Sequence, residues 1–331
     1  MTDNELCQLL LVGVEGESLS VFERSAFTRY PPGGVILFAR NCIDPEKTKA
    51  LIAELQELSI AASGLPLIVA VDQEGGPVMR LKNGFPEYPG ALSLGADNQL
   101  SKTMGTARLL AQSLDQLGIN CNLAPVADLL QRSSRVLRGR CFGVDPELVA
   151  KHVRAFIEGM QERGVAACVK HFPGHGSVVE DSHKLLPVSA LSRSALEMHL
   201  KPFRAAVAAG VKLMMAAHIK FTAIDSQPVP FSTLFLYDIV RLELGFDGIL
   251  LSDDLDMAAV SDRPLPEVMA AGIKAGLDMA LWGRNMKQVA DPEPVIAGFC
   301  RMMKRNFLPS EQLHVKMDRI RRLREEFSRN A

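Results

Sequence analysis

Short runs of apolar residues alternate with longer amphipathic or alanine-rich stretches along the whole chain. Eight of these runs have the length and composition of buried β-strands. They are Gln8 to Val14, Gly34 to Phe38, Pro66 to Val71, Ile119 to Val126, Val165 to Val169, Val211 to Ala217, Gly248 to Leu251 and Met279 to Leu281. Apolar strands separated by helical stretches predict a parallel sheet wrapped by helices.

The stretches between these runs predict helices, because several begin at Ser, Thr, Asp or Pro and end at Gly. They are Pro45 to Ala62, Ser101 to Leu117, Pro146 to Arg163, Ser192 to Ala209, Thr233 to Leu244 and Pro264 to Ala275. Eight strand and helix units favour a single-domain α/β fold, the (β/α)8 TIM-type barrel, over an open sheet. An open nucleotide-binding sheet has a glycine-rich first turn, and this chain offers only Gly13 and Gly16 there.

Two further helices, over Asp291 to Lys304 and Pro309 to Glu326, follow the last predicted strand. The second is strongly charged, which is typical of a helix with a solvated face. No linker or low-complexity segment divides the chain. We therefore expect one catalytic domain over residues 1–331, with the two C-terminal helices, at about 291–327, packed on the barrel.

Composition narrows the class of protein and its partners. The chain is 47% hydrophobic and 23% charged, so it can bury a large core, and its net charge of -1 does not indicate nucleic acid or an acidic membrane as a partner. The six cysteines form no C-x-x-C pair and are expected to be free buried thiols of a reducing compartment. The acidic start does not resemble a signal peptide, and no apolar run approaches the roughly 20 residues that span a bilayer. A cytoplasmic location is expected.

One polar loop stands out, KHFPGHGSVVEDSHKLLP, which follows the apolar run VAACV. Its charged and imidazole side chains are Lys170, His171, His175, Asp181 and His183. Many barrel enzymes place their chemistry at the carboxyl ends of the strands, where this loop begins. A plain turn at Pro173-Gly174 does not need three histidines, and we expect the glycines of the loop, Gly174 and Gly176, to make it mobile.

Polar residues also follow the other predicted strands, and a barrel would bring them together. They are Asp72, Glu74 and Arg80 after the third strand, Asp128 and Arg140 after the fourth, His218 after the sixth, and Ser252, Asp253 and Asp254 after the seventh. Each has a simpler alternative: Asp72 as a turn cap, Arg140 as a surface arginine, His218 as a hydrogen-bonded core histidine.

Of the two adjacent aspartates, we expect one to cap the following helix and Asp253 to face the cavity. The remaining histidines, His152, His199 and His314, lie in predicted helices and are expected at the surface.

A carboxylate that faces a histidine-bearing loop suggests acid/base and nucleophilic chemistry on an acetal or acyl substrate. Glycoside hydrolysis usually needs one group that protonates the leaving oxygen and a carboxylate that captures the oxocarbenium-like centre. Histidine can be the acid because its unperturbed pKa is about 6.5. Asp181, two residues before His183, is the carboxylate placed to orient it.

These residues resemble the motifs of the bacterial β-N-acetylhexosaminidases of glycoside hydrolase family 3, in their compact single-domain form. The most specific part is KHFPGHG followed by DSH and LP. Further matches are DQEGG with a later arginine, GINCNLAPVAD, RCFG, AHI and SDDL, in the same order. So many matches in the same order along the chain are not expected by chance.

The resemblance implies a retaining mechanism with Asp253 as nucleophile and His183 as general acid/base, assisted by Asp181. It implies that a terminal N-acetylglucosamine is held by a set of polar residues, which are Asp72, Arg80, Arg140, Lys170, His171 and His218. The implied function is an exo-β-N-acetylglucosaminidase that removes N-acetylglucosamine from 1,6-anhydro-muropeptides in peptidoglycan recycling, without metal or cofactor. The natural aglycone and the oligomeric state stay open, with a monomer as the expectation.

The chain departs from the family pattern in four places. Pro77 and Met79 follow EGG where an arginine and a glutamine are usual, and Cys141 stands for a serine. The basic segment Gln131 to Arg138 and the residues Trp282 to Asn285 are also atypical. These changes spare the proposed catalytic residues but bear on leaving-group specificity.

Three other functions share part of this residue pattern. A metal-dependent hydrolase would use His171, His175, His218 and Asp253 as ligands, but no H-x-H pair follows the first strand. A phosphorylase with the same covalent chemistry would benefit from a histidine acid, which tolerates an approaching anion. A silent sugar-binding protein on the same fold would be expected to have lost Asp253, His183 or Asp181, and all three are present.

Overall fold

The computed structural model describes residues 1–130, 137–178, 185–260, 263–286, 289–305 and 308–330. Eight parallel strands form the central sheet in the order β10-β1-β2-β3-β4-β5-β7-β9. Their bounds are β1 Leu10–Gly13, β2 Gly34–Leu37, β3 Ile68–Val71, β4 Cys121–Asn122, β5 Ala166–Phe172, β7 Leu213–Ala216, β9 Ile249–Ser252 and β10 Ala280–Trp282. Each lies on a predicted apolar run, so the predicted strands and the (β/α)8 barrel are confirmed.

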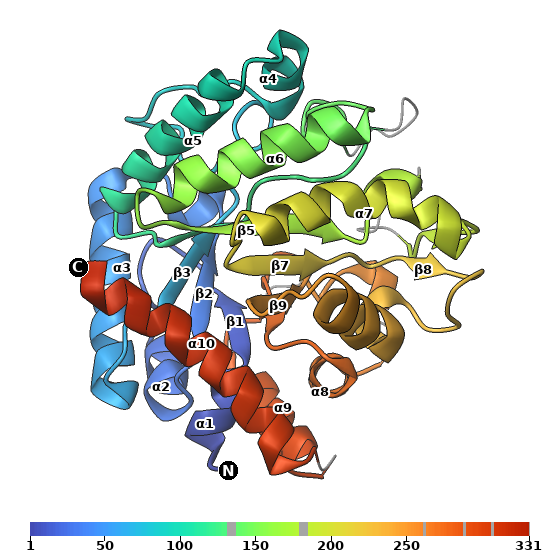
Figure 1. The fold of residues 1–331 in the computed structure, drawn as a ribbon. Helices are drawn as coiled ribbons and strands as arrows, with labels where there is room; N and C mark the ends of the chain where they lie inside the picture. Colours follow the sequence, from blue (N-terminus) through green and yellow to red (C-terminus); the bar gives the residue numbers. More distant parts are fainter. Residues whose placement is uncertain (131–136, 179–184, 261–262, 287–288, 306–307, 331) are drawn as a thin grey trace.

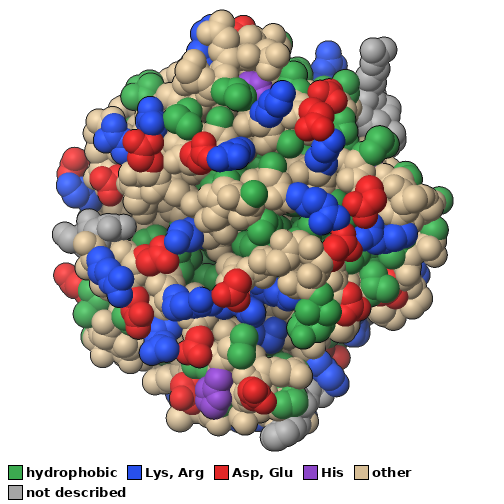
Figure 2. Space-filling view, in the orientation of Figure 1, with side chains coloured by type: hydrophobic (Ala, Val, Ile, Leu, Met, Phe, Trp, Pro, Cys, Tyr) green, Lys and Arg blue, Asp and Glu red, His purple; other side chains and the backbone are tan. Residues whose placement is uncertain are grey.

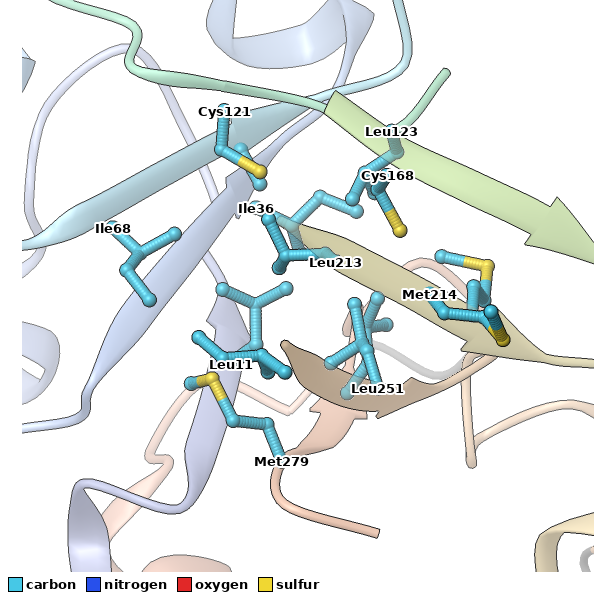
Figure 3. Packing of buried hydrophobic residues seen from close by; sticks show 14 of the residues in the cluster. Leu11, Ile36, Ile68, Cys121, Leu123, Cys168, Leu213, Met214, Leu251 and Met279 are labelled. Carbon is cyan, nitrogen blue, oxygen red and sulfur yellow. The ribbon is translucent and has the colours of Figure 1, made fainter. Parts of the chain in front are cut away.

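The sheet curls until its two edge strands meet. A single parallel bridge, Leu251 to Met279, joins β9 to the start of β10, and the barrel is therefore nearly closed. Apolar side chains fill the interior because all four residues of most strands are buried. Figure 3 shows Leu11, Ile36, Leu213 and Leu251 converging from four different strands.

Helices surround the strands (Figure 1). Those that match the predicted stretches are α3 Pro45–Ser63, α5 Leu100–Asp115, α6 Pro146–Gln161, α7 Arg193–Ala208, α8 Leu265–Ala275, α9 Glu293–Arg305 and α10 Ser310–Asn330. The stretch predicted at Thr233 to Leu244 forms a π-helix, η4 Leu234–Glu243, in which Leu244 N donates to Ile239 O at 2.8 Å. A second, two-stranded sheet pairs β6 (Val188–Ser189) with β8 (Lys220–Phe221).

Three short helices were not predicted, α1 Asp3–Cys7, α2 Val21–Arg29 and α4 Ala91–Asp97. Helix α2 has the capping box of Ser20 and Glu23, but its apolar period is broken. Val21 and Phe22 are exposed, whereas Glu23 is fully buried. A helix that buries a carboxylate and exposes two of its apolar residues cannot be found by hydrophobic periodicity.

Buried side chains of two kinds test the expectations for cysteine and histidine. All six cysteines are free and buried, as predicted. His314 is exposed as expected, but His152 is fully buried, and its Nδ1 lies 2.7 Å from Thr103 Oγ1 while its ring stacks on Phe142. The surface assignment of His152 is therefore wrong, because a helical histidine is readily buried when a neighbouring helix supplies a hydroxyl partner.

Helix α10 crosses the front of the barrel in Figure 1 and covers the amino ends of several strands. Lys316 Nζ donates to Leu277 O, just before β10, at 2.8 Å. Arg324 is 2% exposed and donates to a ring of acceptors near β1 and β3, which are Gln8 Oε1, Ser59 Oγ, Ser63 Oγ, Leu65 O and Pro66 O. Burial lowers the pKa of Arg324 to about 10.

The outer face of the molecule mixes charges of both signs. Basic and acidic side chains are interspersed on the face shown in Figure 2. Several form exposed pairs, such as Arg321 with Asp318 at 3.0 Å and Arg322 with Asp247 at 3.0 Å. None of the helices that the structure describes is both long and apolar enough to cross a membrane.

We predict that Arg324→Met lowers the free energy of unfolding by about 3 kcal/mol, because several buried acceptors would lose their donor at once. The matched variant Arg321→Met, on the exposed face of the same helix, should change it by less than about 0.5 kcal/mol. Urea denaturation followed by circular dichroism measures both. If Arg324→Met lowered the free energy of unfolding as little as Arg321→Met, the apolar face of α10 alone would hold the helix on the barrel.

Candidate active site

Polar residues that follow five different strands converge on one cavity at the carboxyl end of the barrel. Its floor is apolar and consists of Ile36, Leu123, Met215 and Leu281. Its polar lining is Asp72, Glu74, Arg80, Arg140, Lys170, His171, His175, Asp253, Asp254 and Asn285. A concave site with an apolar base and converging charged groups is the usual form of a small-molecule site.

A buried ion network forms one wall of the cavity. Lys170, at the end of β5, is 2% exposed, and its Nζ lies 2.6 Å from Asp72 Oδ1 and 2.8 Å from Glu74 Oε1. Arg140 meets the same Glu74 with two nitrogens, Nε at 2.9 Å from Oε2 and Nη2 at 2.8 Å from Oε1. The bidentate geometry fixes both partners more firmly than a single contact would. The network therefore ties the loop after β3 to β5 and to the loop after β4.

The network determines the charge states of its members. Burial alone would lower the pKa of Lys170, but the carboxylates of Asp72 and Glu74 reverse this effect and raise it. Burial alone would raise the pKa of Glu74, but Lys170 and Arg140 hold it well below its usual range. Glu74 likewise raises the pKa of Arg140 against the effect of burial. All three side chains are thus charged at neutral pH, and hydrogen-bond donors face the cavity.

An aromatic ring and an arginine stand at the side of this wall. Arg80 Nη2 lies 3.4 Å from Asp72 Oδ2. The Phe38 ring lies between two guanidinium groups, with Arg40 Cζ at 4.7 Å and Arg80 Cζ at 6.0 Å from its centroid. Arg40 is held in turn by Asn285 Oδ1, at 2.8 Å from its Nη1. The contacts link the loop after β2 to those after β3 and β10.

Asp128, which follows β4, holds the start of the histidine loop. The carboxylate is fully buried, and its Oδ2 lies 2.7 Å from His171 Nδ1 while its Oδ1 accepts the His175 N–H at 2.6 Å. Burial would raise the pKa of Asp128, but His171 lowers it. An ionised carboxylate beside Nδ1 keeps a proton on that nitrogen and fixes the orientation of the ring. Nε2 is then the ring nitrogen of His171 that is left for another partner. Burial and the nearby His171 lower the pKa of His175.

The two adjacent aspartates follow β9 on the opposite side of the cavity. Asp253 N donates to Ala216 O on β7 at 3.0 Å. Asp254 Oδ1 accepts the N–H groups of Asp256, at 3.1 Å, and Gly283, at 3.0 Å. Burial raises the pKa of Asp254 to about 6. Asp254 thus caps the turn, as one of the pair was expected to do, but both carboxylates line the cavity.

The structure places the predicted residues as follows. Five of the six predicted binding residues line the cavity, namely Asp72, Arg80, Arg140, Lys170 and His171, together with Asp253. His218 follows β7, is fully buried and does not belong to the described lining, so its role in substrate binding stays a prediction. Asp181 and His183 lie outside the described residues, as does most of the atypical segment Gln131 to Arg138. Among the described residues, no group of His, Cys, Asp and Glu side chains is arranged to hold a metal ion.

The glycines of the histidine loop have a packing role that was not expected. A Cβ on Gly176 would lie 1.9 Å from Leu129 O, and one on Gly174 would lie 3.0 Å from the Cβ of His199. The close approaches require glycine at these positions, which the sequence interpretation had assigned to mobility. His199 packs against this loop and is partly buried, contrary to the surface position expected for it.

Among the atypical residues that the structure describes, Leu137 and Asn285 line the cavity and the others do not. Cys141 is buried in a small cluster with Val126 and Leu137, and it does not line the cavity. Pro77 is exposed, and Met79 is buried. Trp282 is buried at the end of β10, whereas Asn285, in the same atypical stretch, does reach the cavity.

Sequence reasoning left several lining residues without a role. Phe38 and Met215 lie on predicted strands and Met257 has no predicted role, whereas Glu74 is predicted only as a polar position, as is Asp128, which holds the histidine loop without lining the cavity. Their position at a strand end was a usable signal, but their partners were not. Apolar residues that face a cavity cannot be distinguished from core residues by pattern alone.

Comparison with known proteins identifies the family. A model described as the glycosyl hydrolase family 3 N terminal domain matches residues 1–323. The chain belongs to glycosyl hydrolase family 3. The resemblance that was inferred from the motifs is thus confirmed, and the protein is a glycosidase.

Relatives cover most of this family 3 chain. The beta-hexosaminidase of Alkalilimnicola ehrlichii is 41% identical over 303 residues, which are 86% of this chain and 85% of that protein. The beta-hexosaminidase of Thiobacillus denitrificans is 40% identical over 280 residues, which are 82% and 77% of the two chains.

Solved structures have the same fold. NagZ from Neisseria gonorrhoeae, in complex with N-trifluoroacetyl-D-glucosamine, aligns with a TM-score of 0.83 and 30% identity over 97% of this chain and 92% of that one. The family 3 β-N-acetylglucosaminidase from Paenibacillus sp. str. FPU-7 aligns with a TM-score of 0.94 and 32% identity. The present chain is covered completely in that alignment and spans 63% of the Paenibacillus chain.

We predict a pH-dependent effect of Glu74→Gln on stability. Folding lowers the pKa of Glu74 below its usual value of 4.5. Its carboxylate therefore stabilises the folded protein at pH values above 4.5, and this contribution decreases as the pH falls below 4.5. At pH 7 the free energy of unfolding of the variant should be about 3 kcal/mol lower than that of the parent. Urea titrations from pH 7 to pH 3.5 should show the gap narrowing below about pH 4.5.

The exposed variant Glu57→Gln is the matched control and should follow the parent within about 0.5 kcal/mol throughout. If the difference in unfolding free energy between Glu74→Gln and the parent stays constant down to pH 3.5, the shape of Glu74, and not its charge, accounts for its contribution to stability.

Proposed function

We propose that this glycosidase is a retaining exo-β-N-acetylglucosaminidase. The observation that carries the proposal is the pairing of a carboxylate after β9, Asp253, with a wall of fixed ionic groups in the same cavity. Asp72, Lys170 and Arg140 suit the hydroxyl groups of one sugar ring, because a polyol is bound by oriented charged partners. The beta-hexosaminidase relatives, and the neighbour bound to an N-trifluoroacetyl-D-glucosamine, support an N-acetylated hexose as the sugar.

The proposed reaction has two steps that use the same acid/base group. In the first, Asp253 attacks the anomeric carbon while His183 protonates the departing oxygen, which gives a covalent glycosyl-aspartate. In the second, His183 removes a proton from water, and the water displaces Asp253 with a second inversion. Asp181 orients His183 in both steps and stabilises its protonated form. The site needs no metal or cofactor for these steps.

The position of the histidine loop supports this assignment. Asp128 fixes the first part of the loop through His171 and His175, and the close packing of Gly176 on Leu129 O leaves it little freedom there. The loop leaves this anchor only a few residues before Asp181 and His183. A rigid anchor close to a general acid favours a reproducible approach to the leaving oxygen.

The binding roles are proposed residue by residue. Asp72 and Arg80 would share one pair of hydroxyls, and Lys170 and Arg140 would hold the next oxygens along the ring. His171 would offer Nε2 to a further hydroxyl. His218 is proposed to support the acetamido side from its position after β7. The substrate would be a terminal N-acetylglucosamine on a 1,6-anhydro-muropeptide, in cytoplasmic peptidoglycan recycling by a monomeric enzyme.

We predict that Asp253→Ala lowers kcat on a nitrophenyl β-N-acetylglucosaminide by at least about a thousandfold, because the covalent step is lost. Proton NMR of the parent reaction should show the β anomer of N-acetylglucosamine first, and the matching β-glucoside should be a poor substrate. An α anomer as first product would exclude the retaining mechanism. Near-normal turnover by Asp253→Ala would remove Asp253 from the mechanism.

Added phosphate provides a test of the phosphorylase alternative in the same assay. A hydrolase should give free N-acetylglucosamine at every phosphate concentration. A sugar 1-phosphate as the main product would contradict hydrolysis as the function. If no substrate is turned over but N-acetylglucosamine binds, the protein is a silent sugar-binding member of the family.

We predict that His183→Ala lowers kcat/KM more for disaccharide substrates than for nitrophenyl glycosides, by about 10-fold or more. A good leaving group departs without full protonation, whereas a sugar oxygen does not. Rates on a series of aryl glycosides with leaving groups of increasing pKa measure the effect. Equal losses across the series would argue against His183 as the acid.

A further inference from the structure

The barrel closes at a seam between β9 and β10, directly beside Asp253. The other neighbouring strands in the sheet pair through at least two residue pairs, and β7 with β9 through four. Between β9 and β10 the described residues form one bridge, Leu251 with Met279, in which Met279 N donates to Leu250 O at 3.2 Å and Ser252 N donates to Met279 O at 3.2 Å. Past this bridge the ladder is irregular: Leu255 N donates to Leu281 O at 3.0 Å, but side chains accept the N–H groups of Leu281 and Gly283.

Side chains accept the next two alternate N–H groups of the β10 segment at this seam. Ser252 Oγ accepts the Leu281 N–H at 2.9 Å, and Asp254 Oδ1 accepts the Gly283 N–H at 3.0 Å. The acceptors are two residues apart on one side, and the donors are two residues apart on the other. Ser252 and Asp254 thus both reach the β10 segment, whereas Asp253 between them lines the cavity, and its Oδ1 accepts the Asp254 N–H at 2.8 Å.

The backbone of Asp253 is also fixed on its other side. Its N–H donates to Ala216 O on β7 at 3.0 Å. Asp254 further accepts the Asp256 N–H at 3.1 Å, which holds the turn that follows. The peptide that carries Asp253 is thus held from β7 by backbone, and from the β10 side by the Ser252 N–H and by the side chains of its two neighbours.

Gly283 provides an independent sign that this contact is built into the chain. A Cβ at this position would lie 2.4 Å from Asp254 Oδ2 and 2.9 Å from the Phe38 ring. Any larger residue would push Asp254 away from the seam. Glycine is therefore required for the approach of Asp254 to the β10 backbone.

We propose that Ser252 and Asp254 are positioning residues, which fix the nucleophile Asp253 by closing the barrel seam with their side-chain oxygens. The proposal rests on the proposed function of Asp253. The role requires a hydrogen-bond acceptor and not a charge, so asparagine should replace Asp254 and alanine should not. A small displacement of a nucleophile costs up to about a hundredfold in rate.

The test compares Asp254→Ala, Asp254→Asn and Gly283→Ala with the parent on a nitrophenyl β-N-acetylglucosaminide. Asp254→Ala and Gly283→Ala should lower kcat by about 10- to 100-fold and change KM by less than about threefold, since the sugar-binding wall lies elsewhere. Asp254→Asn should keep kcat within about threefold of the parent. Gly105→Ala, which adds a methyl group to α5 where no atom lies within 4 Å, is the control for substitution of a glycine.

Amide hydrogen exchange supplies a readout that does not depend on activity. Asp254→Ala should speed exchange of the Gly283 N–H and leave the Leu281 N–H protected, whereas Ser252→Ala should do the opposite. Asp254→Asn should keep both protected. This crossed pattern differs from the uniform loss of protection that general destabilisation would cause, and it does not change if Asp253 proves not to be the nucleophile.

Two results would overturn the proposal. One is a kcat for Asp254→Ala and Gly283→Ala equal to that of Gly105→Ala. The other is an Asp254→Asn variant as slow as Asp254→Ala, which would assign the effect to charge. Asp253→Ala is measured in parallel, and retained turnover there would refute the proposed function while the exchange pattern still decides whether the seam is closed by these side chains.

Discussion

A buried ammonium group organises the active end of this barrel. Lys170 projects from the end of β5 into a nearly closed space, where an unpaired charge would cost several kcal/mol. Asp72 and Glu74 balance this charge from the loop after β3, and Arg140 balances the second carboxylate from the loop after β4. Removal of any one partner would leave another buried charge uncompensated. The loops after β3 and β4 and the end of β5 are therefore held in one arrangement by a single electrostatic constraint.

Asp128 extends this constraint to the loop that bears the proposed general acid. The carboxylate is buried beneath the loop and binds both a ring nitrogen and a backbone N–H of it. The ion network fixes the residues that would hold the sugar, and Asp128 fixes the start of the segment that would protonate its leaving group. Both depend on parallel strands, because only a parallel barrel presents all of these strand ends on one side.

The sequence predicted the eight strands because each is a continuous apolar run, buried on both faces. It also predicted most of the polar lining, since Asp72, Lys170 and Asp253 each follow such a run directly. The partners within the site could not be predicted, because Lys170 meets Glu74 across a strand that lies between β3 and β5. The spacing of residues along the chain does not show which loops face each other across a barrel.

Burial of polar residues accounts for most of the wrong predictions. Helix α2 was missed because its buried face carries Glu23, which pairs with Arg284 from the loop after β10. His152 was placed at the surface because its partner, Thr103, lies on another helix. In each case a polar residue is buried by a specific partner distant in the sequence. Hydrophobic periodicity treats such a residue as exposed, and only the partner shows otherwise.

The cavity has two walls that are built in different ways. One wall is an ion network, and the other is a strand end at which side chains accept two N–H groups of the neighbouring β10 segment. Both walls stand on the apolar residues Ile36, Leu123, Met215 and Leu281. Close-packed side chains resist compression, so this layer acts as a rigid spacer between the ion network and Asp253. If Asp253 is the nucleophile, as proposed, we expect a substitution that changes the volume of this floor to alter its approach to the sugar.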